Sequence, residues 1–146
     1  MIVGLIACGG AKRAQLCAAR DLYTGSLFRA NRAWIERNTP RWAILSAKHG
    51  VLDPRQPVVP YKLKLKDFSP AELTAWGERV REQLRVKFPQ AEFLILGGTE
   101  YRSALEGLPH FYPMSGLDDM RFGKQLAWLK RNPAWRRPES ATLRSP

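Results

Sequence analysis

Three short apolar segments of the sequence each run into a loop of glycine and polar residues. The segments are 2–6, 42–45 and 93–96. Apolar runs of this length without alternation are typical of strands buried on both faces, as in a parallel sheet. The carboxyl ends of parallel strands share one edge, which is where ligands bind in open α/β sheets. We therefore expect the polar residues of the three loops to line one crevice.

The residues expected at this edge offer carboxylates, cationic donors and aromatic rings. Cleavage or exchange of a base at an N-glycosidic bond needs a carboxylate near the sugar, a donor near the departing base and a surface on which a flipped base stacks. The candidate catalytic residues are Asp21, Lys48, His49 and Glu100. The candidate substrate-binding residues, which include glycine amides and cations suited to phosphate, are Cys8, Gly9, Gly10, Lys12, Arg20, Tyr23, Ser46, Tyr61, Lys62, Gly97, Gly98, Thr99 and Tyr101.

Each of these residues also has an ordinary structural interpretation. Lys48 and His49 fit an exposed turn before a Gly50 with positive φ, and Asp21 fits a turn that its side chain caps. The tyrosines fit core packing with a locally bonded hydroxyl, and Cys8 is either an activated nucleophile or a small buried side chain. The two cysteines and two histidines have no zinc-ligand spacing. We expect neither a metal nor a cofactor.

The chain is strongly basic, with a net charge of +11 from 24 Lys and Arg against 13 Asp and Glu. Such a field attracts phosphates and makes nucleic acid the expected class of partner, with a free nucleotide as the alternative. Both the body and the C-terminal fifth are basic, which favours a phosphate-facing surface. The candidate nucleic-acid-binding residues are Arg29, Arg32, Lys64, Arg121, Lys124, Lys130, Arg131, Arg136 and Arg137.

The length of 146 residues suits one domain. We predict a single α/β domain over residues 1–131, built as a three-layer sandwich with a mainly parallel central sheet of about four strands flanked by helices. Residues 132–146, rich in Pro, Arg and Ser, are predicted to be a basic, disordered tail. No segment is apolar and long enough to span a membrane and no signal peptide is evident, so we expect a cytoplasmic protein without a membrane partner. The oligomeric state stays open.

Helix signals fall between the predicted strands. A helix capped by Ser26 is predicted to run to about Asn38, and apolar side chains at helical spacing predict the face toward the sheet, at Leu27, Ala30, Trp34 and Ile35. Ser69, Pro70 and Glu72 form the pattern of a capping box that opens a second helix before Pro89. A short helix capped by Thr99 and a last helix over 121–130 complete the set, with an edge strand over 110–113 between them.

The segment 51–67 contains three prolines and predicts an irregular connection beside the binding edge. Within it, residues 61–65 alternate between apolar residues and lysine, which is typical of an edge strand. The segment is therefore expected to add one strand next to the crevice.

Five short motifs resemble those of the YaaA peroxide-stress family and occur in the same order over residues 1–105. They are DLYTG at 21–25, LSAKHGVLDP at 45–54, PYKLKL at 60–65, Trp76-Gly77, and ILGGTEY at 95–101. The family equivalents are D-V-Y-T-G, L-S-G-x-Y-G-x-L-x-P, x-P-Y-R-L-E, F-W-G and a small-residue loop ending in D-E-Y. The chain is more similar still to a compact group of bacterial and phage proteins with a C-x-x-x-K first loop and an S-A-K-[YH]-G second loop.

The resemblance implies DNA, in preference to RNA, as the partner and a role in limiting oxidative damage. The wider relatives of that family are similar to uracil-DNA-glycosylase-like and base-exchange domains. This chain has no room for a helix-hairpin-helix-like insertion, and Lys48-His49 replaces an uncharged residue followed by tyrosine. Our leading hypothesis is a nucleic-acid-associated enzyme that cleaves or exchanges a base or modified base at its N-glycosidic bond. The alternatives are a DNA-binding stress-protection protein without turnover and a domain that binds a small nucleotide or transfers a nucleoside.

Overall fold

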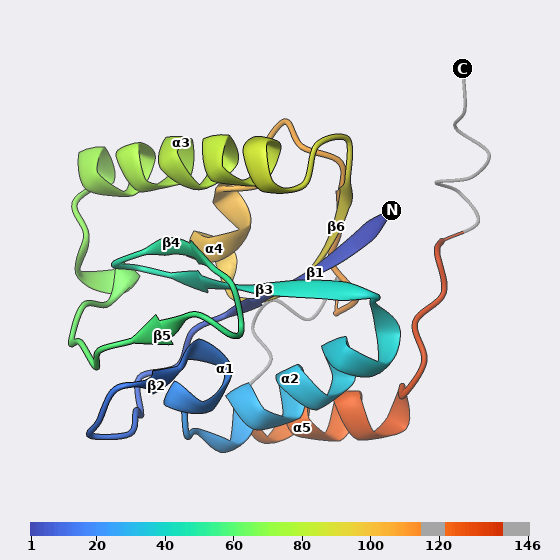
Figure 1. Cartoon of the computed structure of the whole chain (residues 1–146). Helices are drawn as coiled ribbons and strands as arrows, with labels where there is room; N and C mark the ends of the chain where they lie inside the picture. The colour runs from blue at the N-terminus through green and yellow to red at the C-terminus, as the bar shows by residue number, and fades with distance from the viewer. Residues whose placement is uncertain (115–121, 139–146) are drawn as a thin grey trace.

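A computed structural model of the chain describes residues 1–114 and 122–138. Within these residues a five-stranded sheet has the order β4-β3-β1-β6-β7 (Figure 1). Strands β1 (Ile2–Ala7), β3 (Arg41–Ser46), β6 (Glu92–Leu96) and β7 (His110–Phe111) are parallel, and β4 (Gly50–Leu52) pairs antiparallel with β3. The three apolar runs of the sequence are thus the three central parallel strands, as predicted.

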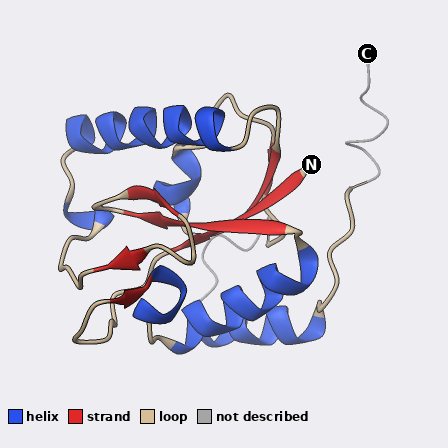
Figure 2. Cartoon of the chain, in the orientation of Figure 1, coloured by secondary structure: helices blue, strands red, loops and turns tan. Residues whose placement is uncertain are grey.

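Helices cover both faces of the sheet (Figure 2). Helices α3 (Pro70–Lys87) and α4 (Thr99–Ser103) lie on one face, and α2 (Ser26–Asn38) and α5 (Phe122–Arg131) lie on the other. Successive strand residues alternate between the two cores, so Leu5 packs toward α3 whereas Ile6 packs toward α2. The predicted three-layer α/β sandwich with a mainly parallel sheet is confirmed.

The capping box predicted for α3 is formed. The Ser69 hydroxyl accepts from the Glu72 amide at 3.1 Å, and the Glu72 carboxylate accepts from the Ser69 amide at 2.9 Å. Pro70 begins the helix, where its missing N–H is no loss. Trp76, together with Val80 and Leu84, is then buried against the sheet.

Two predicted caps are wrong, and the predicted inner face of α2 is incomplete. Helix α2 includes Ser26 and takes Gly25 as its N-cap, and α4 likewise begins at Thr99 after Gly98, with no side-chain cap bond in either case. Trp34 and Ile35 are buried as predicted, and Leu27 and Ala30 are partly buried against the same core. Phe28 and Asn31 are buried as well, and the Phe28 ring packs on Tyr23 with centroids 4.9 Å apart.

The connection between β3 and α3 contains more regular structure than expected, but no strand forms over 61–65. It holds β4 and the short strand β5 (Pro57–Val58), which pairs with β2 (Cys17–Ala18) beside α1 (Ala19–Leu22), and it ends in a 3₁₀ turn, η1 (Leu65–Asp67). Tyr61 is buried in the core under α2, whereas Leu65 is buried in the core under α3. Residues 61–66, which we call the crossing segment, run across the carboxyl edge of the sheet. This path prevents them from pairing as a strand.

The C-terminal part returns to the domain. Helix α5 buries Leu129, and Trp34 donates from Nε1 to the Asn132 carbonyl. Trp135 packs on Phe111, with ring centroids 5.3 Å apart, and Arg137 forms an ion pair with Glu92. The described part of the segment expected to be a disordered tail, up to residue 138, therefore contacts the domain. No helix among the described residues is long and apolar enough to cross a membrane.

Candidate functional site

The loops after β1 and β6 meet at the carboxyl edge of the sheet, and the crossing segment closes one side of the hollow between them. This hollow, the crevice, has a volume of about 300 Å³. It is lined by Cys8, Gly9, Gly10, Lys12, Leu63, Lys64, Leu65, Lys66, Glu100 and Tyr101. Six of the predicted catalytic and substrate-binding residues thus come together here, along with the predicted nucleic-acid-binding residue Lys64.

Lys12 is the cation at the wall of the crevice. Its Nζ lies 4.4 Å from the centroid of the Tyr61 ring and donates to the Gly10 carbonyl at 3.3 Å. Burial lowers the pKa of the Lys12 ammonium, an effect that the neighbouring Cys8 opposes and the charge of Lys64 reinforces. An isolated antiparallel β-bridge between Lys12 and Tyr23 holds the loop after β1 in place. The arrangement presents an ammonium group that a bound anion would stabilise.

Tyr101 and Cys8 face each other in the crevice. The Cys8 Sγ and the Tyr101 hydroxyl are 3.4 Å apart, and the Tyr101 ring meets Trp76 edge-on, with centroids 5.7 Å apart. Burial raises the pKa of the Tyr101 hydroxyl above its usual range, so the group stays protonated and can donate a hydrogen bond. Glu100 precedes it on α4 and brings an exposed carboxylate to the same hollow.

Behind the crevice, three buried hydroxyl groups form a hydrogen-bonded network. The Tyr61 hydroxyl lies 2.6 Å from that of Tyr23 and 2.6 Å from that of Ser46. Ser46 Oγ also accepts from the amides of Lys48 and His49, each at 3.2 Å. Burial raises the pKa of both tyrosines, which remain neutral. The hydroxyls of Tyr23 and Tyr61 are thus bonded locally, as expected for tyrosines that pack in the core. The hydroxyl network braces the crossing segment against β3.

We expect Tyr61→Phe to destabilise the protein by about 1–3 kcal/mol, because the buried hydroxyls of Ser46 and Tyr23 lose their shared partner. Urea unfolding of the two proteins measures the difference. Tyr112→Phe, which changes a less buried tyrosine, is the matched control. Equal stability of Tyr61→Phe and the unchanged protein would contradict the bracing role.

Lys48 and His49 occupy the turn before β4 and do not line the crevice. Gly50 has φ of +71°, as the turn interpretation predicts. Lys48 borders a separate hollow beside α3, and the His49 ring meets Tyr61 edge-on with centroids 5.5 Å apart. Burial lowers the pKa of His49, and the nearby charges of Lys48 and Arg79 lower it further. Lys48 is therefore not brought together with Lys12, whereas His49 and Lys12 both contact the Tyr61 ring although His49 does not line the crevice.

The His49 environment predicts a pH dependence of stability. The unfolded chain takes up a proton near pH 6.5, whereas folded His49 does so only at lower pH, so between these values the unfolded state binds more protons. The free energy of unfolding should fall as the pH drops from 7 through the lowered pKa. We expect His49→Gln to flatten this part of the profile, measured by urea unfolding between pH 5 and 8. An unchanged slope in His49→Gln would assign the acid sensitivity to other groups.

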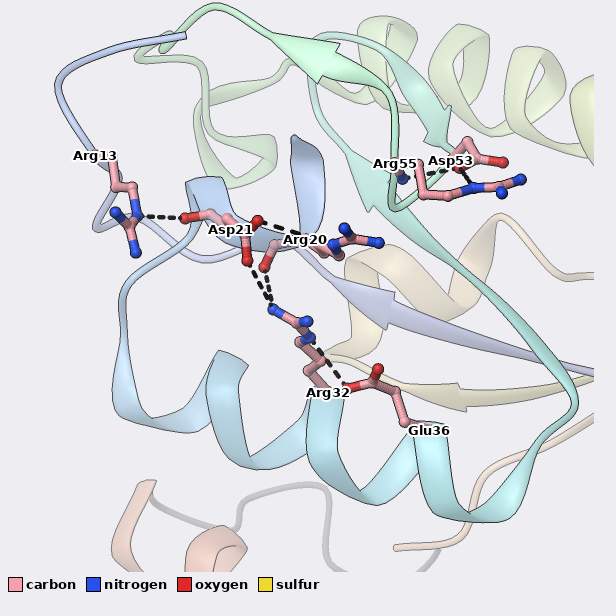
Figure 3. Close-up of polar contacts among 7 residues, drawn as sticks. All are labelled: Arg13, Arg20, Asp21, Arg32, Glu36, Asp53 and Arg55. Carbon is pink, nitrogen blue, oxygen red and sulfur yellow. Dashed lines mark hydrogen bonds and ion pairs between the residues drawn. The ribbon is translucent and has the colours of Figure 1, made fainter. Parts of the chain in front are cut away.

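Asp21 and Arg20 lie outside the crevice, on α1 (Figure 3). The Asp21 carboxylate pairs with Arg32 at 3.1 Å and with Arg20 at 3.8 Å. It borders a different hollow, which is lined mainly by arginines. Glu100, and not Asp21, is the carboxylate that the structure brings to Lys12 and Tyr101.

The remaining predicted residues are spread over the surface. Gly97, Gly98 and Thr99 lead into α4 next to the crevice without lining it, and Lys62 is exposed beside it. Lys124, Lys130, Arg131 and Arg136 are exposed on and after α5, while Arg121 lies outside the described residues. Sequence reasoning missed Leu63, Leu65 and Lys66 as lining residues. The alternation of lysine after Tyr61 was the available signal, but it was interpreted as an edge strand.

No three His, Cys, Asp or Glu side chains are grouped so as to hold a metal ion within residues 1–114 and 122–138. The fold and the crevice define a compact α/β domain whose polar site lies at the carboxyl edge of a parallel sheet. The chain belongs to a family of unknown function, DUF6884, whose sequence model matches residues 3–131. A search of curated proteins gives no match.

Proposed function

We propose that the protein is a nucleic-acid-associated enzyme that acts on a base or nucleoside in the crevice, by cleavage or exchange at the N-glycosidic bond. The observation that carries the proposal is the meeting of Lys12, Glu100 and Tyr101 around one hollow of about 300 Å³. That volume lies at the lower end of the range for small-molecule sites. The glycine amides at positions 9 and 10 complete the site with donors suited to phosphate.

Each group has a role in the proposed reaction. As the glycosidic bond breaks, positive charge develops on the sugar and negative charge on the departing base. The Glu100 carboxylate stabilises the sugar cation, and the Lys12 ammonium or the Tyr101 hydroxyl donates to the base. The departing base keeps the electron pair of the broken bond and receives a proton from its donor. Water or an incoming base then bonds to the anomeric carbon and gives its proton to the Glu100 carboxylate. Lys64 and Lys66, at the mouth of the crevice, contact the phosphates on either side.

The polymer is proposed to be DNA. The ordered motifs that resemble the YaaA family support this choice, and the net charge of +11 supports a polyanionic partner in general. A DNA-binding protein without turnover is the second candidate. The observation in its favour is that no arginine lines the crevice, whereas six line two other hollows around α1, α2 and the first half of β3.

The test is release of bases from defined DNA. Single-stranded and duplex oligonucleotides carrying uracil, oxidised or alkylated bases, or 7-deazaguanine derivatives are incubated with the protein, and abasic sites are then cleaved with alkali. We expect one class of substrate to give cleaved product and a freed base detectable by chromatography. Exchange is detected by incorporation of a labelled free base. If the protein binds these oligonucleotides but neither releases nor exchanges a base in any of them, the result would contradict the proposed enzyme and favour a DNA-binding protein without turnover.

A further inference from the structure

A second polar region lies around α1 and the first half of α2, separate from the crevice. A hollow of about 330 Å³ is lined there by four arginines, Arg13, Arg20, Arg29 and Arg32, with Asp21 and Glu36 among them. Figure 3 shows Arg13, Arg20 and Arg32 gathered around Asp21, with Glu36 beside Arg32. None of the residues lining the crevice borders this hollow.

The hollow continues into a larger one of about 480 Å³ beside the first half of β3, because Arg20 and Glu36 border both. The second hollow adds Arg41, Arg55 and Lys87. Among the described residues, the two hollows together are lined by seven basic side chains and three acidic ones, an excess of four positive charges. We call this surface the arginine track, and it consists of Arg13, Arg20, Arg29, Arg32, Arg41, Arg55 and Lys87.

The acidic side chains hold several guanidinium groups in fixed positions. Arg32 bridges Asp21 at 3.1 Å and Glu36 at 3.1 Å, and it also donates to the Arg20 carbonyl at 3.0 Å. Arg13 donates from Nε to the Asp21 carbonyl at 2.8 Å. A side chain already fixed by such bonds loses less conformational entropy when it binds an anion. Two carboxylates thus order Arg32 and a main-chain carbonyl orders Arg13, and the track keeps its excess of positive charge.

We propose that the arginine track binds the sugar-phosphate backbone of a nucleic acid strand outside the crevice. A planar guanidinium group can donate two parallel hydrogen bonds to two oxygens of one phosphate, and a row of such groups across two adjoining hollows suits a polymer with repeated phosphates. A membrane-binding face would add apolar side chains to insert among the lipids. None of the large apolar side chains that are exposed in the described structure, Met1, Leu16, Val59, Leu63 and Val86, borders the track. The inference rests on the proposed function only in taking nucleic acid as the partner.

The test replaces three exposed members of the track, Arg13, Arg29 and Arg55, by glutamine in one protein. The control replaces Arg79, Arg81 and Arg85 by glutamine, which gives the same net charge, because these arginines lie on α3 and border neither hollow of the track. Circular dichroism verifies that both variants fold. Binding of a fluorescently labelled 20-nucleotide DNA, single-stranded and duplex, is measured by anisotropy at several salt concentrations.

We expect the track variant to bind at least tenfold more weakly than the unchanged protein, and the control to stay within about twofold to threefold. The slope of log K against log salt should fall by about 2–3 in the track variant, because three phosphate contacts are lost. Equal losses in the two variants would overturn the proposal, since only net charge would then matter. Tighter binding to phosphatidylserine vesicles than to DNA, lost in the track variant alone, would overturn it in favour of a lipid surface.

Failure of the track can be told apart from failure of the proposed enzyme. If the proposal for the arginine track is correct and the proposed enzyme activity is not, the track variant loses DNA binding, and neither it nor the unchanged protein releases a base. If the enzyme is correct and the track is not, base release continues and binding responds equally to both sets of substitutions. A nucleoside substrate, which has no phosphate for the track to bind, should react equally with the track variant and the unchanged protein.

Discussion

Glu100→Gln is expected to lower the rate of base release at least a hundredfold while leaving the fold unchanged. The substitution keeps the size of the side chain and removes the negative charge that faces the sugar in the proposed reaction. Loss of one electrostatic stabiliser of a transition state typically costs about 10²–10³ in kcat. The side chain is exposed, so its neutralisation should change the free energy of unfolding by less than about 0.5 kcal/mol. Single-turnover kinetics on the substrate found in the base-release test measures the chemical step directly.

Glu106→Gln is the matched control, because Glu106 is also an exposed carboxylate just after α4 but does not line the crevice. We expect its rate of base release to equal that of the unchanged protein. The effect of Glu100→Gln should appear in kcat with little change in KM, since the charge acts on the transition state. A fully active Glu100→Gln protein would exclude Glu100 from the chemistry.

Trp76→Ala is expected to destabilise the protein by about 3–5 kcal/mol, the usual cost of removing a buried tryptophan. Trp76 is 4% exposed, packs edge-on against Tyr101 and donates from Nε1 to the Ser46 carbonyl at 2.9 Å. The substitution therefore leaves a cavity, leaves the Ser46 carbonyl without this donor and removes the support of one crevice wall. Urea unfolding gives the change in stability.

Two further variants separate these contributions. Trp76→Phe keeps an aromatic ring beside Tyr101 but loses the bond to Ser46, so we expect a smaller loss of about 1–3 kcal/mol. Trp135→Ala removes a half-buried tryptophan far from the crevice and should cost less than Trp76→Ala. If Trp135→Ala were the more damaging change, Trp76 would not be the main support of this part of the core.

Much of the fold is predictable because its signals are local. Unbroken apolar runs predicted β1, β3 and β6, and the capping box at Ser69 predicted the start of α3. The parallel pairing of the three strands then placed their loops at one edge. Strand pairing alone therefore predicts that Cys8, Lys12 and Tyr101 share one site.

The parts that could not be predicted depend on long-range packing. The segment 61–65 alternates like a strand, but its path follows from the burial of Tyr61 on one face and Leu65 on the other. Lys48 and His49 also follow a parallel strand, yet the hydrogen bonds of their amides to Ser46 turn the chain back into β4. Position in sequence after a strand therefore indicated the correct edge but not the direction of each side chain.

The separation between the crevice and the arginine track has the same origin. The motif that contains Asp21 predicts a catalytic carboxylate, but the Asp21 ion pair with Arg32 forms across eleven residues of sequence and depends on how α1 packs against α2. Composition shows the surplus of arginine without showing which arginines share a surface. Only the tertiary structure divides the basic residues between the two regions.

The central claim, that the crevice is the ligand site, is tested most directly by nuclear magnetic resonance of ¹⁵N-labelled protein. The titrants are a nucleoside 5′-monophosphate and a trinucleotide with an abasic analogue at its centre. We expect the largest shifts at the backbone amides of residues 8–12 and at Glu100 and Tyr101, and their loss in Lys12→Ala. Saturable shifts confined to Arg29, Arg32 and their neighbours, with the amides of residues 8–12 unmoved, would contradict the assignment of the site.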